Sequence, residues 1–84
     1  MMDLRQAVQI AKERAAEMFG PERFLLEEIE RESYKGHEVW SITLSLPDEE
    51  AVGFAQLSNP RKYKRFLIDA ETGELVAMKL REVA

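Results

Sequence analysis

Hydrophobic residues recur every three to four positions near the start of the chain, which predicts an amphipathic helix over residues 3 to 19. Asp3 followed by Gln6 fits a capping box, in which each side chain accepts a hydrogen bond from the other residue's backbone N–H. Gly20 and Pro21 then end the helix, because glycine tolerates the left-handed cap and proline cannot continue the hydrogen-bond ladder. The predicted apolar face comprises Leu4, Ala7, Val8, Ala11, Ala15, Met18 and Phe19, with Ile10 at its edge.

Beyond the helix the hydrophobic period changes to two, which is typical of strands with one apolar face. The clearest strand alternates Trp40, Ile42, Leu44 and Leu46 with Val39, Ser41, Thr43 and Ser45. Two later strands are marked by Phe66 and Ile68, and by Val76, Met78 and Leu80. Residues 69–73 join these two as a hairpin, in which Gly73 suits a position of positive φ.

Residues 23–32 predict a first strand whose phase is ambiguous. Phe24 and Leu26 share one side while Leu25 and Ile29 share the other, which indicates either a bulge or burial at one end. Residues 33–36 predict a turn into the Trp40 strand. The long connection from Pro47 to Pro60 contains three apolar residues that could extend or cover the sheet edge, namely Val52, Phe54 and Leu57.

The order of one helix followed by four strands predicts an α+β fold, in which the N-terminal helix packs on a four-stranded antiparallel meander. A single helix covers only one side of such a sheet. We therefore expect the other side to face either water or a partner.

With 84 residues the chain is one domain over 1–84, since a second core would not fit. No apolar run approaches the roughly 18 to 20 residues of a membrane span, and the N-terminus lacks the pattern of a signal peptide. The absence of cysteine excludes disulfides, thiolate metal sites and a cysteine nucleophile. We expect a cytoplasmic protein that does not associate with membranes.

The formal net charge of −4 argues against nucleic-acid binding, which requires cations to neutralise phosphates. Acidic residues concentrate in 27–32 and 48–50, whereas 61–65 is strongly basic with Tyr63 among its cations. Because strand residues alternate sides, only some of those cations share a face, which favours pairing with acidic neighbours over a nucleic-acid site.

Candidate chemistry is sparse. His37 stands alone in a predicted turn without a positioned nucleophile, and is interpreted as a solvated histidine. The acidic groups at 48–50 and around Asp69, Glu71 and Glu74 lack the ligand spacing of a cation site. Phosphate-loop, metalloprotease and nucleophile-elbow motifs are absent from the sequence. Trp40 could anchor a partner, but its alternation with Ile42 favours a core position. We expect no catalytic residue, metal or cofactor.

Two segments carry a family resemblance. The sequence LRQAVQIA, from Leu4 to Ala11, is similar to the opening helix of PepSY domains, and YKRFLIDAETGELV, from Tyr63 to Val76, resembles their closing hairpin with its V-D-x-x-T-G-x-V signature. EVWSI, from Glu38 to Ile42, lies where that family places its middle strand. The resemblance implies a helix packed on an antiparallel sheet, related to the cystatin-like roll. It also implies a binding or inhibitory module rather than an enzyme.

Three functions remain open. The first is a non-catalytic interaction module that binds an unidentified protein or a second copy of itself as a homodimer. The second is a cytoplasmic immunity-type inhibitor of a toxin, whose acidic strand and loop would face a basic surface. The third is an enzyme or small-ligand carrier with a pocket between helix and sheet. The candidate interaction residues are Glu28, Glu30, Glu49, Tyr63, Arg65 and Leu67.

Overall fold

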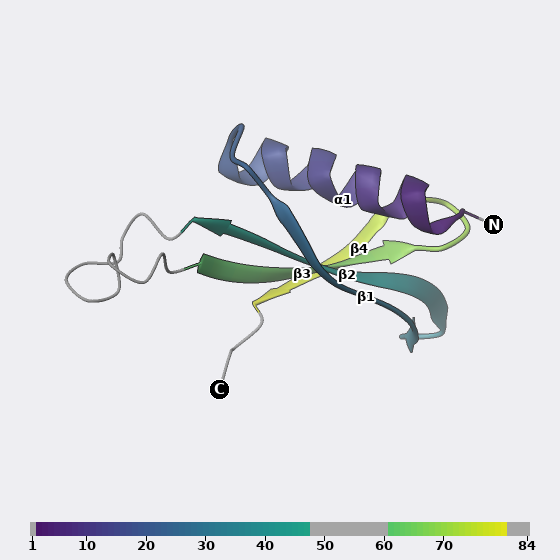
Figure 1. Cartoon of the computed structure of the whole chain (residues 1–84). Helices are drawn as coiled ribbons and strands as arrows, with labels where there is room; N and C mark the ends of the chain where they lie inside the picture. The colour runs from purple at the N-terminus through teal and green to yellow at the C-terminus, as the bar shows by residue number, and fades with distance from the viewer. Residues whose placement is uncertain (1, 48–60, 81–84) are drawn as a thin grey trace.

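The computed structural model describes residues 2–47 and 61–80, which form one helix and four strands in the predicted order (Figure 1). These elements are α1 (Leu4–Phe19), β1 (Leu25–Tyr34), β2 (His37–Pro47), β3 (Arg61–Asp69) and β4 (Leu75–Leu80). The strands form one antiparallel sheet in the order β1-β2-β3-β4, so the predicted α+β meander is confirmed. The predictions for Glu49, Val52, Phe54 and Leu57 lie outside the described residues.

The ends of α1 follow from local hydrogen bonding. The Asp3 carboxylate accepts a hydrogen bond from the Gln6 N–H at 2.9 Å, and the Gln6 side chain accepts one from the Asp3 N–H at 3.1 Å. This reciprocal pair satisfies two N–H groups that have no partner within the helix. At the other end Gly20 adopts a φ of +86°, and its N–H donates to the Ala16 carbonyl. The capping box is confirmed, and the helix ends before the predicted glycine, although the ψ of Gly20, at 179°, is not that of a left-handed cap.

Three alanines one turn apart, Ala7, Ala11 and Ala15, form the buried stripe of α1. Their short side chains let the helix lie close to β2 and β3, where it meets the core residues Ile42, Leu44, Phe66 and Ile68. Leu4 and Met18, which the hydrophobic period places on the same stripe, are exposed instead. They lie in the first and last turns of the helix, away from the central alanines that contact the sheet.

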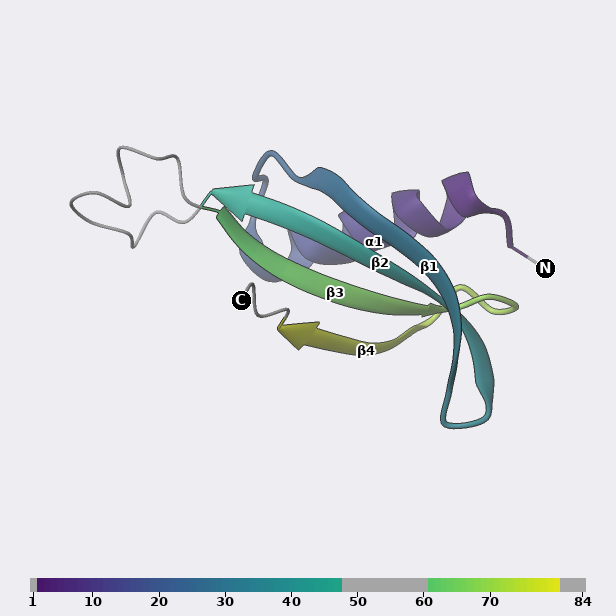
Figure 2. The ribbon, with the colours of Figure 1, turned by 60° about the horizontal axis from the view of Figure 1, so that its bottom comes forward.

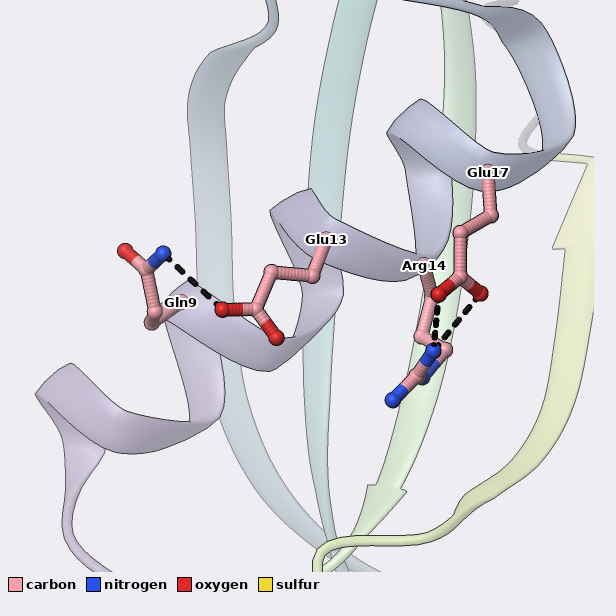
Figure 3. Close-up of polar contacts among 4 residues, drawn as sticks. All are labelled: Gln9, Glu13, Arg14 and Glu17. Atoms are coloured by element: carbon pink, nitrogen blue, oxygen red, sulfur yellow. Dashed lines mark hydrogen bonds and ion pairs between the residues drawn. The ribbon is translucent and has the colours of Figure 1, made fainter.

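Pairs of polar side chains form hydrogen bonds along α1 (Figure 3). Arg14 Nη1 contacts both carboxylate oxygens of Glu17, at 2.5 and 2.6 Å, and Gln9 Nε2 donates to Glu13 Oε1 at 3.2 Å. Such neighbours three or four residues apart each stabilise a helix by about 0.2–0.5 kcal/mol. The hydrogen bond and charge of Glu17 raise the pKa of Arg14 above its ordinary value.

A bulge resolves the ambiguous phase of β1. The register slips between Leu26 and Glu28, so Leu26 lies opposite Leu44 and Ile29 opposite Ile42, all on the side of the sheet that faces α1. The extra residue, Glu27, is absorbed on the opposite side. Of the two explanations left open by the sequence, the bulge is confirmed.

Two tight turns connect the paired strands. Between β1 and β2 the turn residues are Lys35, with a φ of +49°, and Gly36, with a φ of +83°. Two consecutive residues of positive φ are typical of the type I′ turn, whose twist matches that of the flanking strands. Between β3 and β4 Gly73 has the positive φ expected from the sequence, at +78°.

Met2, the residue before the helix cap, connects α1 to one end of the sheet through two hydrogen bonds. The Met2 N–H donates to the Ala70 carbonyl at 2.7 Å, and the Met2 carbonyl accepts from Trp40 Nε1 at 3.1 Å. Trp40 is partly buried against the core, as its alternation with Ile42 predicts, and the Arg31 guanidinium lies 4.9 Å from its ring centre.

Candidate interaction surface

The helix covers one side of the sheet and leaves the other, here named the open face, without a helix among the described residues (Figure 2). Because paired residues in an antiparallel sheet share a face, the register assigns the side chains of the open face directly. They are Leu25, Glu28, Glu30, Glu32 and Tyr34 on β1 with the bulge residue Glu27, His37, Val39, Ser41, Thr43, Ser45 and Pro47 on β2, Arg61, Tyr63, Arg65, Leu67 and Asp69 on β3, and Ala77 and Lys79 on β4.

Apart from Asp69 at the end of β3, acidic and basic side chains of the open face lie on different strands. The four glutamates of β1 form an acidic column, and Arg61, Arg65 and Lys79 place cations on the opposite half of the sheet. The short side chains of β2 lie between them. Ser41, Thr43 and Ser45 are buried, between the longer side chains of β1 and β3.

Ser45 joins the two charged columns at one end of the face. Its Oγ donates to Glu27 Oε2 at 2.6 Å and accepts from Arg61 Nε at 2.7 Å. Arg61 Nη2 also donates to the carbonyls of Ser45, at 3.0 Å, and Arg23, at 3.4 Å. The Ser45 hydroxyl thus connects the Glu27 carboxylate on β1 with the Arg61 guanidinium on β3. The same guanidinium connects the segment before β1 to the start of β3.

The sheet curls at the other end of the face. Lys79 of β4 lies 4.8 Å from the ring centre of Tyr34 of β1, although these strands are the two edges of the sheet. This contact requires the end of the β1–β2 hairpin to bend over the open face, and in Figure 1 the hairpin turns away from α1. Because Lys79 is exposed, such a cation–π contact contributes about 0.5–1 kcal/mol.

His37 of β2 and Asp69 at the end of β3 lie in contact. His37 Nδ1 lies 3.2 Å from Asp69 Oδ2, while Asp69 Oδ1 accepts from the N–H groups of Glu71 and Thr72. These backbone hydrogen bonds, with a smaller contribution from His37, lower the pKa of Asp69. The His37 side chain is 59% exposed, in agreement with the solvated histidine expected from the sequence. The Asp69 contact was not expected, because it depends on the pairing of β2 with β3.

Two features of the described residues bear on chemistry, namely their potential metal ligands and a depression along α1. No group of three or more His, Cys, Asp or Glu side chains among them is arranged to hold a metal ion. A shallow depression of about 360 Å³ lies along the first half of α1, lined by Met2, Arg5, Gln6, Gln9 and Ile10. Arg5 is the one ionisable side chain in that lining, so the depression gathers no acid–base pair.

Five of the six candidate interaction residues from the sequence are brought together on the open face. Glu28 and Glu30 lie in the acidic column, and Tyr63 and Arg65 lie partly buried on β3. Leu67 shares this face but is fully buried, so its side chain presents no surface to a partner. Glu27 and Lys79 belong to the same surface. The β1 bulge brings Glu27 to this face, and the pairing of β3 with β4 brings Lys79 there.

The basic segment 61–65 divides as the strand alternation predicts. Arg61, Tyr63 and Arg65 face the open side, whereas Lys64 turns toward α1, where its Nζ lies 5.7 Å from the Phe19 ring centre. The cations of this segment therefore do not form one continuous patch.

Comparison with known proteins gives no relative: no family model, no curated protein and no solved structure matches the chain. The helix of the described part is neither long nor apolar enough to cross a membrane.

Proposed function

We propose that this chain is a non-catalytic protein-interaction module that binds its partner through the open face. One observation carries the proposal: among the described residues α1 covers a single side of the sheet, and on the other side four glutamates lie on β1 while the cations lie on β3 and β4, with Asp69 at the end of β3 as the one carboxylate on that half. Separated charges of this kind steer a partner of complementary potential and fix its orientation.

The acidic column is the part of this surface best placed to meet a partner. Glu27, Glu28 and Glu30 are exposed and lie on an edge strand, so that a basic surface can approach both their carboxylates and the outer side of β1. A partner with lysine or arginine side chains at strand spacing would match this column. The expected partner is therefore a protein with a basic surface.

The PepSY resemblance is part of the same proposal. A helix followed by four antiparallel strands is the architecture that the resemblance implies, and modules of this kind are regarded as binding or inhibitory.

The acidic column also favours a narrower candidate, an immunity-type inhibitor of a basic toxin. Inhibitors of this kind gain fast association from carboxylates that face a basic active site. A toxin encoded beside the gene of this protein would support the narrower candidate. An isolated gene would count against it.

The test is quantitative affinity capture from the native host with three forms of the chain. These are the unaltered protein, Glu28→Gln/Glu30→Gln on the open face, and the matched control Glu13→Gln/Glu71→Gln. Both variants remove two exposed carboxylates, but the control residues lie on α1 and in the β3–β4 turn. Circular dichroism first establishes that all three forms fold alike.

We expect a protein with a basic surface to be retained by the unaltered chain and the control, and to be depleted about tenfold on the open-face variant, with weaker capture as salt increases. Equal depletion on both variants would indicate an effect of net charge alone. Equal retention on all three forms would place the binding surface elsewhere and overturn the proposal.

A further inference from the structure

The two edges of the sheet differ in how they resist pairing with another strand. An edge strand presents unpaired N–H and C=O groups, and proteins protect such edges with charges, bulges or short length. Among the described residues β1 and β4 each have a neighbour on one side only. Any strand that extends this sheet must therefore add to one of these two.

Strand β1 carries strong protection against a second copy of itself. A two-fold axis through its centre would place its glutamates opposite those of the other copy, and like charges directly opposite each other are destabilising. Leu25 and Leu26 do expose apolar surface at its start, but the bulge between Leu26 and Glu28 interrupts regular pairing there.

Strand β4 lacks the column of like charges that protects β1, although it is short, at six residues, and its register with β3 shifts between the Leu67–Ala77 and Ile68–Leu75 pairs. Its sequence is LVAMKL, with Lys79 as the single charge. Val76 and Met78 are exposed to 36% and 39%, and the main contacts of α1 are with β2 and β3. An exposed apolar edge of this kind is the type of strand that pairs with another chain.

We propose that β4 is a homodimer interface, at which the β4 strands of two copies pair antiparallel about a two-fold axis. The result is a continuous eight-stranded sheet with both helices on the same side. This interface goes beyond the proposed function, because it requires no other protein and uses the edge opposite the acidic column.

The sequence of β4 is self-complementary in this arrangement. With the axis at Met78, that residue meets its own copy, Lys79 lies opposite Ala77, and no like charges face each other. The arrangement covers Val76 and Met78. It also places the second copy of the helix on the same side of the extended sheet, beyond the β4 edge. No other described strand combines an open edge with a nearly uncharged sequence.

The first test is the solution mass of the purified full chain, measured by sedimentation equilibrium over about a hundredfold range of concentration. We expect a reversible shift from 9.7 kDa toward the mass of two chains. Met78→Lys should weaken the dimer roughly tenfold or more, since it places a charge at the axis and removes apolar contact. Met18→Lys is the matched control, because Met18 is 48% exposed and the charge change is identical.

The second test locates the interface without relying on a disruptive variant. Since the chain has no cysteine, Met78→Cys, Met18→Cys and Glu30→Cys each introduce one thiol. A short bismaleimide should link Met78→Cys into dimers and leave the other two variants monomeric. A monomer at every concentration, a dimer insensitive to Met78→Lys, or preferential linkage at the Glu30→Cys edge would each overturn the proposal.

Discussion

The Asp69 carboxylate lies 3.2 Å from His37 Nδ1 and joins the two hairpin turns of the sheet. Its second oxygen accepts hydrogen bonds from the backbone of the β3–β4 turn, at Glu71 and Thr72. The neighbouring Ala70 donates its N–H to the Glu38 carbonyl and accepts from Met2. The start of α1, the β1–β2 hairpin and the β3–β4 turn therefore meet around these two consecutive residues.

The first prediction concerns acid stability. The folded-state pKa of Asp69 lies below its ordinary value of 3.8, so its ionised form stabilises the fold fully above that value. That contribution is lost as the pH falls through the folded-state pKa. Asp69→Asn keeps the acceptor oxygen but cannot ionise, so its free energy of unfolding should fall less steeply below pH 4. Urea denaturation at a series of pH values measures this slope.

The control for this prediction is Glu71→Gln, which removes an exposed carboxylate from the same turn. It leaves both backbone hydrogen bonds to Asp69 in place. If Asp69→Asn and the unaltered chain lose stability in parallel below pH 4, the assigned role of Asp69 is wrong.

The second prediction compares two glycines of positive φ. A Cβ at Gly36 would meet nothing within 4 Å, so Gly36→Ala should cost about 1–2 kcal/mol from backbone strain alone. A Cβ at Gly73 would lie 2.5 Å from Met2 Cε and 3.1 Å from Ile10 Cδ1. Gly73→Ala should therefore cost more than Gly36→Ala, by up to about 1 kcal/mol, since the ends of the Met2 and Ile10 side chains must shift to admit the new methyl group.

A double variant separates strain from overpacking at Gly73. Met2→Ala should recover part of the additional loss, because it removes the nearest obstructing atom. Equal losses at Gly36 and Gly73 in thermal unfolding would show that the helix start does not pack on the turn.

The third prediction concerns Trp40, the single tryptophan of the chain. Trp40→Phe keeps an aromatic ring but removes the hydrogen bond to the Met2 carbonyl, which should cost about 1 kcal/mol. Trp40→Ala also removes packing against the core and should cost about 3 kcal/mol. Chemical denaturation followed by circular dichroism measures both. A loss below about 1 kcal/mol for Trp40→Ala would mean that the ring contributes little to the core.

The fourth prediction concerns the buried hydroxyl that joins the charged columns. Ser45→Ala removes a partner from both Glu27 and Arg61 and should cost about 1–3 kcal/mol. Ser41→Ala is the control, because Ser41 is also buried on β2 but takes no part in this network. Similar losses for the two variants would mean that the Glu27–Ser45–Arg61 contact contributes nothing specific.

Local signals along the chain were sufficient to predict the elements of the fold. The Asp3–Gln6 pair, the glycine after Phe19 and the alternation around Trp40 each act over a few residues, and the structure confirms all of them. The exposure of Leu4 and Met18 was not predictable in the same way. A hydrophobic period identifies the side of a helix but not how far the helix extends over its sheet.

The candidate surface required the register between strands. Whether Ile29 shares a side with Ile42 depends on a bulge that the sequence left open, and the bulge also adds Glu27 to the acidic column. The contact of His37 with Asp69, and that of Tyr34 with Lys79, arise from pairing and curvature across the sheet. Residue types alone do not encode such long-range pairings.

The most direct test of the open face as a binding surface is hydrogen–deuterium exchange of the chain, alone and with its captured partner. Partner binding should slow exchange along β1, between Leu25 and Tyr34, while the amides of α1 exchange at unchanged rates. Slowed exchange confined to α1, with β1 unaffected, would contradict the account.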